Sequence, residues 1–295
     1  MKRIYTLVLT TLSLTLLMNG YSMIQVDSAE SLDIRVMTFN IRTGYAEDGE
    51  NHWNLRKEFV CDVIRQHAPD VLGVQEAVRF QLDEINQRLP EYSEAGIGRD
   101  GGDKGEYSAI LYRKKQFDVD ESGTFWLSDT PAKPSAPWGN SYLRICTWAR
   151  LIDKQTTRPF YIYNTHLDHQ SQPAREKGAR LIMKRIAERT HKDPFVLTGD
   201  FNAGENNPVI GYLKGTGSFA DPTPIPVVDS FRILHPDEKV VGTGHWFSGE
   251  VGGEKIDYIF IPPDAHALEA AIVRTNRHGR YPSDHYPVTA QLLFK

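Results

Sequence analysis

The sequence predicts an α/β protein in which packed β-sheets carry helices on their outer faces. Strands and helices alternate early in the chain, and strands dominate later. Several predicted strands are apolar runs that stop abruptly at a polar residue, as residues 195–199 do before Asp200 and Asn202. Such runs are typical of strands that are covered on both faces. The pattern therefore favours sheets with outer helices over a helical bundle.

Length and composition are ordinary for a soluble globular protein. The chain has 295 residues, of which 40% are hydrophobic and 24% are charged. This length allows two domains, but no Ser/Gly-rich linker, charge block or internal repeat lies between Leu32 and Lys295. We therefore expect a single domain over residues 30–295.

The N-terminus has the pattern of a secretory signal peptide. Met1, Lys2 and Arg3 precede an apolar run over residues 4–18, which is too short to favour a permanent membrane span. A signal over residues 1–29 would be cleaved after Ser22 or Ala29. The sequence thus predicts an exported protein, periplasmic or extracellular, and it indicates no obligate protein partner.

Charge and cysteine content limit the classes of partner. The formal net charge is -4, whereas a non-specific nucleic-acid binder usually carries a basic surplus, although a local basic groove stays compatible with this balance. Cys61 and Cys146 are the two cysteines. Export permits a disulfide between them, and two buried free thiols are an equally acceptable interpretation.

The predicted elements follow in a regular order along the chain. Residues 126–138 read as a proline-studded loop, and 204–253 as loops and short elements over a site. The predicted helices cover 53–67, 80–89 and 173–189. The predicted strands cover 34–40, 70–76, 107–113, 143–152, 160–168, 195–199, 255–261 and 288–294.

Polar residues gather at or near the ends of these strands. Taken alone, Asp200 and Asn202 favour an Asx-turn that closes a strand. In the strand at 160–168, period-two geometry places Asn164, His166 and Asp168 on one face, which becomes polar toward the strand end. Sites in α/β sheets form at such strand ends, so the group as a whole indicates a functional site. Its members are Asn40, Glu76, His166, Asp200, Asn202, Asp257, Asp284 and His285.

Three of these residues suit a hard divalent cation. Glu76, Asp284 and Asn40 offer oxygen ligands, and so few carboxylates leave room for water and a substrate phosphate, which is typical of Mg²⁺. Mn²⁺ is the expected substitute. Two carboxylates with His166 would suit zinc, but the chain has no HExxH motif and no cysteine pair.

The remaining residues suit proton transfer and phosphate binding. A pair of His285 and Asp257 would raise the pKa of the imidazole, so that its cation contacts a phosphate. Asp200 would orient and deprotonate a water, with Asn202 directed toward a phosphoryl oxygen. Metal-assisted hydrolysis of a phosphate ester uses every one of these parts.

These residues stand in ordered motifs that resemble the endonuclease/exonuclease/phosphatase superfamily. The motifs are Thr38-Phe39-Asn40, Gln75-Glu76, Asn164-Thr165-His166-Leu167, Gly199-Asp200-Phe201-Asn202, Ile256-Asp257-Tyr258-Ile259 and Ser283-Asp284-His285. The resemblance covers nearly the whole chain after the signal. It implies a four-layer α/β/β/α sandwich of two mixed sheets, with the site where the sheets meet.

The resemblance also implies individual roles. Glu76 would be the principal Mg²⁺ ligand beside Asn40, with Asp284 supporting the ion. Asp200 and Asn202 would activate water and bind phosphate, and Asp257 would pair with His285. His166 matches the second histidine of the deoxyribonuclease-like branch, where a glutamate pairs with it; Gly105-Glu106-Tyr107 places Glu106 in that role.

Substrate recognition is the least determined part. Arg144 reads equally as a phosphate contact or as a sheet-edge charge. Trp126 and Trp138 would stack on a nucleobase or sugar, and core packing explains them equally well. The candidate substrates are nucleic acid, inositol phosphate, sugar phosphate and a phospholipid head group.

Two other functions compete with a phosphoesterase. A catalytically silent binding protein on the same fold would use Trp126, Trp138 and Trp246 as a platform for carbohydrate or lipid, but it predicts an eroded site, and the site positions are intact. A glycosidase would leave the histidines and asparagines without a role.

Overall fold

The computed structural model describes residues 31–136, 138–139, 142–217 and 221–295. The predicted signal peptide, residues 1–29, lies outside the described residues. No helix within the described ranges is both long enough and apolar enough to cross a membrane.

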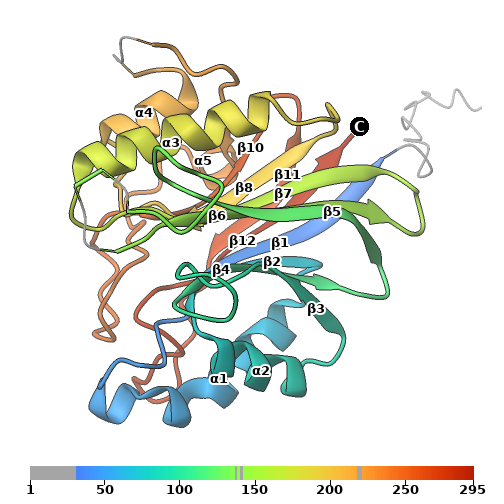
Figure 1. Ribbon diagram of the computed structural model, residues 1–295. Helices are drawn as coiled ribbons and strands as arrows, with labels where there is room; N and C mark the ends of the chain where they lie inside the picture. The colour runs from blue at the N-terminus through green and yellow to red at the C-terminus, as the bar shows by residue number, and fades with distance from the viewer. Residues whose placement is uncertain (1–30, 137, 140–141, 218–220) are drawn as a thin grey trace, which may run out of the picture.

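Two six-stranded mixed sheets pack face to face, as Figure 1 shows. The first runs in the order β11 (His266–Ile272), β12 (Val288–Phe294), β1 (Leu32–Asn40), β2 (Val71–Ala77), β4 (Tyr107–Arg113), β3 (Tyr92–Ala95). The second runs in the order β5 (Phe117–Trp126), β6 (Ile145–Asp153), β7 (Pro159–His166), β8 (Phe195–Asp200), β10 (Asp257–Ile261), β9 (Val228–Asp229).

Helices cover the outer face of each sheet, which confirms the predicted four-layer α/β/β/α sandwich (Figure 1). The first sheet packs on α1 (Trp53–His67) and α2 (Arg79–Arg88), and the second on α3 (Gln172–Ala187) and α4 (Pro208–Lys214). Three apolar clusters fill the spaces between the layers, one of them between the two sheets. The short elements η1 (Gly49–Asn51) and α5 (Ser230–Leu234) complete the fold.

The strand pairing brings polar strand ends to one place. β1 and β2 are parallel, as are β7 and β8, so the carboxyl ends of each pair lie together. His166 lies opposite Asp200 in the β7–β8 register, and antiparallel β10 places Asp257 opposite Asp200 on its other side. Residues that are far apart in the sequence thus meet at one edge of the sandwich.

A buried polar network joins the two sheets beneath that edge. Gln75 Nε2 donates to Asn164 Oδ1 at 2.7 Å, and Asn164 Nδ2 donates to the carbonyls of Val74 and Ala109 at 2.9 and 2.8 Å. A Cβ atom on Gly73 would lie 2.6 Å from Asn164 Oδ1, so glycine permits this close approach. Because every member of such a buried network must keep its hydrogen bonds, the network fixes the position of one sheet relative to the other.

The prediction from the sequence did not include several helices and strands. Strands β3, β5, β9 and β11 and the short helices α4 and α5 were not predicted individually, and β5 ends at Trp126, where a loop was expected to begin. Cys61 and Cys146 are both buried and free; they belong to different apolar clusters on opposite sides of the sandwich, so no disulfide joins them.

Candidate active site

A pocket of about 600 Å³ opens at the edge where the strand ends meet. Loops after β1 and before β10 form part of its wall, and Asn40 and Asp257 contact its lining residues from beneath. The structure therefore brings all the predicted strand-end residues together. The predicted residues that line the pocket are Glu76, Glu106, Arg144, His166, Asp200, Asn202, Asp284 and His285.

The backbone is strained at this pocket. Glu76 and Asn202 have left-handed φ values of 61° and 46°. Arg42 and Trp246, which also line the pocket, have φ values of 58° and 50°. A non-glycine residue in this region costs about 1–3 kcal/mol and persists where the surrounding structure imposes it, commonly at functional sites. Glu76 lies where the β2–β4 pairing is irregular, between Val74 and Ala77, and Asn202 lies in the loop after β8.

Asp200 lies at the centre of the polar contacts. Its Oδ1 accepts the Asn202 backbone N–H at 2.9 Å, and its Oδ2 accepts Asn40 Nδ2 at 3.0 Å. Oδ2 is also 3.5 Å from His166 Nε2 and 3.8 Å from His285 Nε2. Burial, with the nearby charge of Asp257, raises the pKa of Asp200 to about 7. A carboxyl group with such a pKa is matched to proton transfer near neutral pH.

His285 is held as a cation by its partners. Its Nδ1 contacts Asp257 Oδ2 at 2.9 Å. Burial opposes the charge, but the carboxylates of Asp257 and Asp200 outweigh it and hold the pKa of His285 well above its usual value. The predicted His285–Asp257 pair is present, and Nε2 is left facing Asp200 and the pocket.

His166 has the opposite environment. Asn202 Nδ2 donates to Leu167 O at 3.0 Å and contacts His166 Nε2 at 2.9 Å, so this ring nitrogen accepts and the proton lies on Nδ1. Nδ1 is buried without a hydrogen-bond partner among the described residues. Burial and the charge of Arg144 lower the pKa of His166 well below its usual value, and the ring is neutral.

The predicted pairing of Glu106 with His166 is wrong in this structure. Glu106 Oε2 instead accepts Arg99 Nη1 at 2.6 Å, although Glu106 and His166 border the same small cavity of about 10 Å³. A guanidinium is a stronger partner for a carboxylate than a neutral imidazole, because the bond is charge-assisted at both ends.

The acidic residues form a candidate metal centre. Ligand atoms of Asp200, Asp257 and His285 lie within 4.8 Å of one another, although the protonated His285 ring does not itself bind a metal ion. Among the described residues, Asp257 Oδ1 is buried without a hydrogen-bond partner. Glu76 faces the same pocket; burial would raise its pKa, but the Asn40 amide, the charge of His285 and the Thr43 N–H together lower it. Converging carboxylates with an unpaired buried oxygen fit a hard divalent cation.

Asn40 has a different orientation from that of an oxygen ligand. Its Nδ2 donates to Glu76 Oε1 and to Asp200 Oδ2, both at 3.0 Å, while its Oδ1 accepts the Arg42 N–H. Asn40 thus holds two carboxylates together. Asp284 also lies among these charges: its Oδ2 is 3.8 Å from Arg42 Nε, and burial raises its pKa.

The guanidinium groups of Arg144 and Arg99 also line the pocket. Arg144 is 6% exposed, and its Nη2 contacts His169 Nδ1 at 3.0 Å. Its Nε lies 3.8 Å from Asp168 Oδ2 and has no hydrogen bond to a described residue. Arg99 lines the pocket beside it. Such groups suit the binding of phosphate oxygens.

Of the tryptophans, Trp126 and Trp138 are not among the lining residues, so the expectation that they bind substrate there is wrong. Trp126 is buried and donates from Nε1 to Arg99 O at 2.6 Å, and Trp138 packs on the core beside α3. Trp246 lines the pocket instead and is 76% exposed. The three therefore form no common platform.

Sequence reasoning missed several lining residues on loops: Arg42, Arg99, Tyr142, His169 and His245. Arg42 and His245 lie close in sequence to Asn40 and Trp246, but no periodic pattern in a loop indicates which side chains turn inward. Only the proximity of Arg42 to a predicted strand-end residue could have suggested it.

Comparisons with known proteins agree with this geometry. The sequence model of the endonuclease/exonuclease/phosphatase family matches residues 37–285. A mannosyl-6-phosphatase of Bacteroides thetaiotaomicron is 32% identical, with a TM-score of 0.79, over 88% of this chain and 100% of that chain. An endonuclease/exonuclease/phosphatase of Bacteroides vulgatus is 34% identical, with a TM-score of 0.79, over 88% and 98%.

A more distant relative is nocturnin of Drosophila melanogaster. It is 26% identical over 317 residues, which cover 91% of this chain and 48% of that protein. The chain thus spans about half the length of this relative.

Proposed function

The chain belongs to the endonuclease/exonuclease/phosphatase family, and from that premise we propose that it is an exported, Mg²⁺-dependent hydrolase of small phosphate esters, with a sugar phosphate as substrate. The observation that carries the proposal is the pocket in which a carboxyl group of pKa about 7, a histidine cation and two arginines converge. Each of these groups has a use in phosphate-ester hydrolysis.

The protein's own residues provide the proton transfer. Asp200 accepts a proton from the attacking water, whose oxygen bonds to phosphorus as the ester P–O bond breaks, and the released alkoxide takes a proton from solvent to leave as an alcohol. The His285 cation, fixed by Asp257 at 2.9 Å, faces the phosphoryl oxygens, where negative charge develops. Asn202 Nδ2 is engaged by His166 and Leu167, so Asn202 acts here by orienting Asp200 through its backbone N–H.

Glu76 and Asp284, which both line the pocket, would hold the Mg²⁺ ion, which when bound neutralises phosphate charge and favours attack by water. Mn²⁺ would replace it with the same ligands. The donor chemistry supports this assignment, because two carboxylates face one pocket.

Three observations favour a small ester over a nucleic acid. The net charge is -4, and three arginines line the pocket itself. Trp246 and the 48%-exposed Tyr142 stand at the rim, where a sugar ring could pack on them. One similar structure is described as a mannosyl-6-phosphatase.

The test is hydrolysis of mannose 6-phosphate, bis-p-nitrophenyl phosphate and single-stranded DNA by the purified chain. We expect fastest turnover of the monoester, loss of activity with chelator and recovery with Mg²⁺. Asp200→Ala should abolish turnover, whereas Asp118→Ala, which removes a 71%-exposed carboxylate on β5, should not. Activity that survives chelation or Asp200→Ala would overturn the assignment as a metal-dependent hydrolase. Faster hydrolysis of DNA than of mannose 6-phosphate would overturn the proposal that the substrate is a sugar phosphate.

Export rests on the N-terminal sequence alone, where a basic start precedes a short apolar run. Expression of the full chain in a bacterial host, followed by N-terminal sequencing of the periplasmic protein, tests it. We expect a first residue of Met23 or Glu30. An intact Met1 in the cytoplasmic fraction would contradict export.

A further inference from the structure

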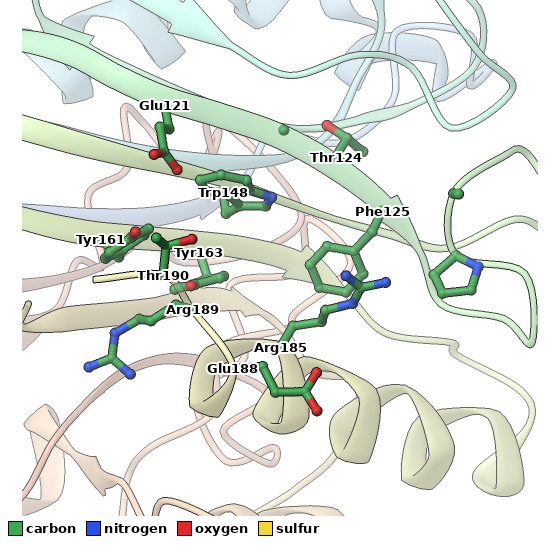
Figure 2. A pocket seen from close by; sticks show the side chains of 13 residues that line it. Glu121, Thr124, Phe125, Trp148, Tyr161, Tyr163, Arg185, Glu188, Arg189 and Thr190 are labelled. Carbon is green, nitrogen blue, oxygen red and sulfur yellow. The ribbon is translucent and has the colours of Figure 1, made fainter. Parts of the chain in front are cut away.

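A second cavity, of about 500 Å³, lies on the outer face of the second sheet (Figure 2). Strands β5, β6 and β7 form its floor, and the C-terminal end of α3 forms its side. It is separate from the catalytic pocket, because Tyr161 and Tyr163 point to the helix side of β7, while Ile162 and Asn164 point between the sheets.

Aromatic side chains dominate the lining. Phe125, Trp148, Tyr161 and Tyr163 surround the hollow, as Figure 2 shows. The Tyr161 and Tyr163 rings lie 6.0 Å apart at 20°, and Trp148 lies 6.0 Å from Tyr161.

A glycine makes room for this wall. Gly123 on β5 pairs with Trp148 on β6, which pairs with Tyr163 on β7. A Cβ atom on Gly123 would lie 3.0 Å from Trp148 Nε1, closer than normal packing allows. The indole therefore lies across bare backbone at a position where a strand residue would ordinarily contribute a side chain.

Several polar groups around the cavity have no hydrogen bond to any described residue. These are the Trp148 indole N–H, the Tyr163 hydroxyl and the Arg185 guanidinium, which packs over the Phe125 ring at 5.7 Å. Tyr163 is 3% exposed, so its hydroxyl is a nearly buried polar group that borders the cavity. Glu121 and Glu188 add acceptors at the rim.

We propose that this cavity is a binding site for a saccharide ring. Aromatic walls with a few unsatisfied polar groups are the usual composition of a small-molecule site. Free donors and rim carboxylates match the acceptor and donor character of sugar hydroxyls, and aromatic faces pack on the C–H face of the ring. A lipid chain would leave the Tyr163 hydroxyl, which belongs to a buried residue, without a partner. The lining offers two arginines and two glutamates, so it does not select a strongly charged ligand.

The proposal does not depend on the proposed catalytic function. The test is saturation-transfer NMR and calorimetric titration of the full chain with the methyl α-glycosides of mannose, glucose, galactose and N-acetylglucosamine, with AMP and decanoate as other ligand classes. We expect at least one glycoside to bind with millimolar affinity, in Asp200→Ala as in the native chain. Binding of none of the glycosides, or of AMP or decanoate alone, overturns the proposal.

Three substitutions locate the binding, and each should weaken it: Trp148→Ala, Tyr163→Phe and Arg185→Ala. Trp148→Ala should weaken glycoside binding about tenfold or more. Tyr163→Phe removes only the hydroxyl and should weaken it about three- to tenfold without unfolding the chain or changing phosphate-ester turnover. Lys214→Ala, which removes an exposed cation on α4, is the matched control for Arg185→Ala and should bind as the native chain does. Undiminished glycoside binding in both Tyr163→Phe and Arg185→Ala would contradict the assignment of the binding site to this cavity.

Discussion

His285 and His166 both lie close to the carboxylate of Asp200, but the other contacts of the two rings give them opposite charge states. Asp200 Oδ2 is 3.8 Å from His285 Nε2 and 3.5 Å from His166 Nε2. His285 has its own carboxylate, Asp257, and its pKa is raised well above the usual value. His166 has an amide partner and a nearby arginine, and its pKa is lowered well below that value.

The difference shows that burial does not decide the charge of these rings, since both are almost fully buried. The second contact of each ring decides it. Asp257 supplies a negative charge to Nδ1 of His285, whereas Arg99 occupies the carboxylate that was expected to do the same for His166. His285 can therefore stabilise developing negative charge. His166 is neutral, accepts a hydrogen bond from Asn202 and forms part of the pocket wall.

The largest effect should follow from removing the carboxylate that charges His285. Asp257→Asn keeps the volume but removes the charge, so the pKa of His285 falls and kcat/KM for the phosphate ester should fall by about 100-fold or more. Steady-state kinetics from pH 5.5 to 9 measure this, with thermal melting as the check that the fold is intact. A loss smaller than tenfold in a folded variant would show that the cation is not needed.

Asp200, the carboxylate shared by both rings, should make the metal-free protein less stable as pH rises. Its pKa is about 7 in the folded state and 3.8 ordinarily, so between these values the folded state binds the extra proton. The free energy of unfolding should therefore decrease from about pH 4 to pH 7. Urea titrations in chelator should show a smaller decrease in Asp200→Asn. An equal decrease in both proteins would mean that Asp200 is not protonated in the folded state.

The smallest effect should come from Glu106, the residue expected to charge the second histidine. Because Glu106 is bonded to Arg99, Glu106→Gln should leave the pKa of His166 nearly unchanged and reduce kcat/KM less than about tenfold, which is below the roughly 100- to 10,000-fold contribution of a general acid–base group. The same kinetic assay measures it beside Asp257→Asn. Equal losses in the two variants would indicate that Glu106 pairs with His166 as Asp257 pairs with His285, which would contradict the structure.

Much of the fold was predictable because its central strands are continuous apolar runs. The helix at 53–67 and the strand at 288–294 have their predicted bounds, since hydrophobic periodicity and Pro69 define them. Strand β11 is mostly exposed and β3 is four residues long, so neither has a strong pattern. Edge strands of this kind depend on pairing with a neighbour, which the local sequence does not record.

The candidate site was predictable in its strand-end residues and not in its partners. Asp257 and His285 could be paired in advance because both follow ordered motifs. The ion pair between Arg99 and Glu106 could not be predicted from the sequence. Arg99 lies in a loop whose path depends on backbone hydrogen bonds, such as that from Arg99 N to Glu106 O at 2.9 Å. The positive φ values of Glu76 and Asn202 are likewise imposed by tertiary contacts, because local preference opposes them.

The most direct test of the central claim is a ¹⁵N-detected NMR titration of the imidazole rings in metal-free protein, assigned with His285→Gln and His166→Gln. At pH 6.5 the account predicts a doubly protonated His285 and a neutral His166 with its proton on Nδ1. A protonated His166, or two rings that titrate together near their usual pKa, would contradict it.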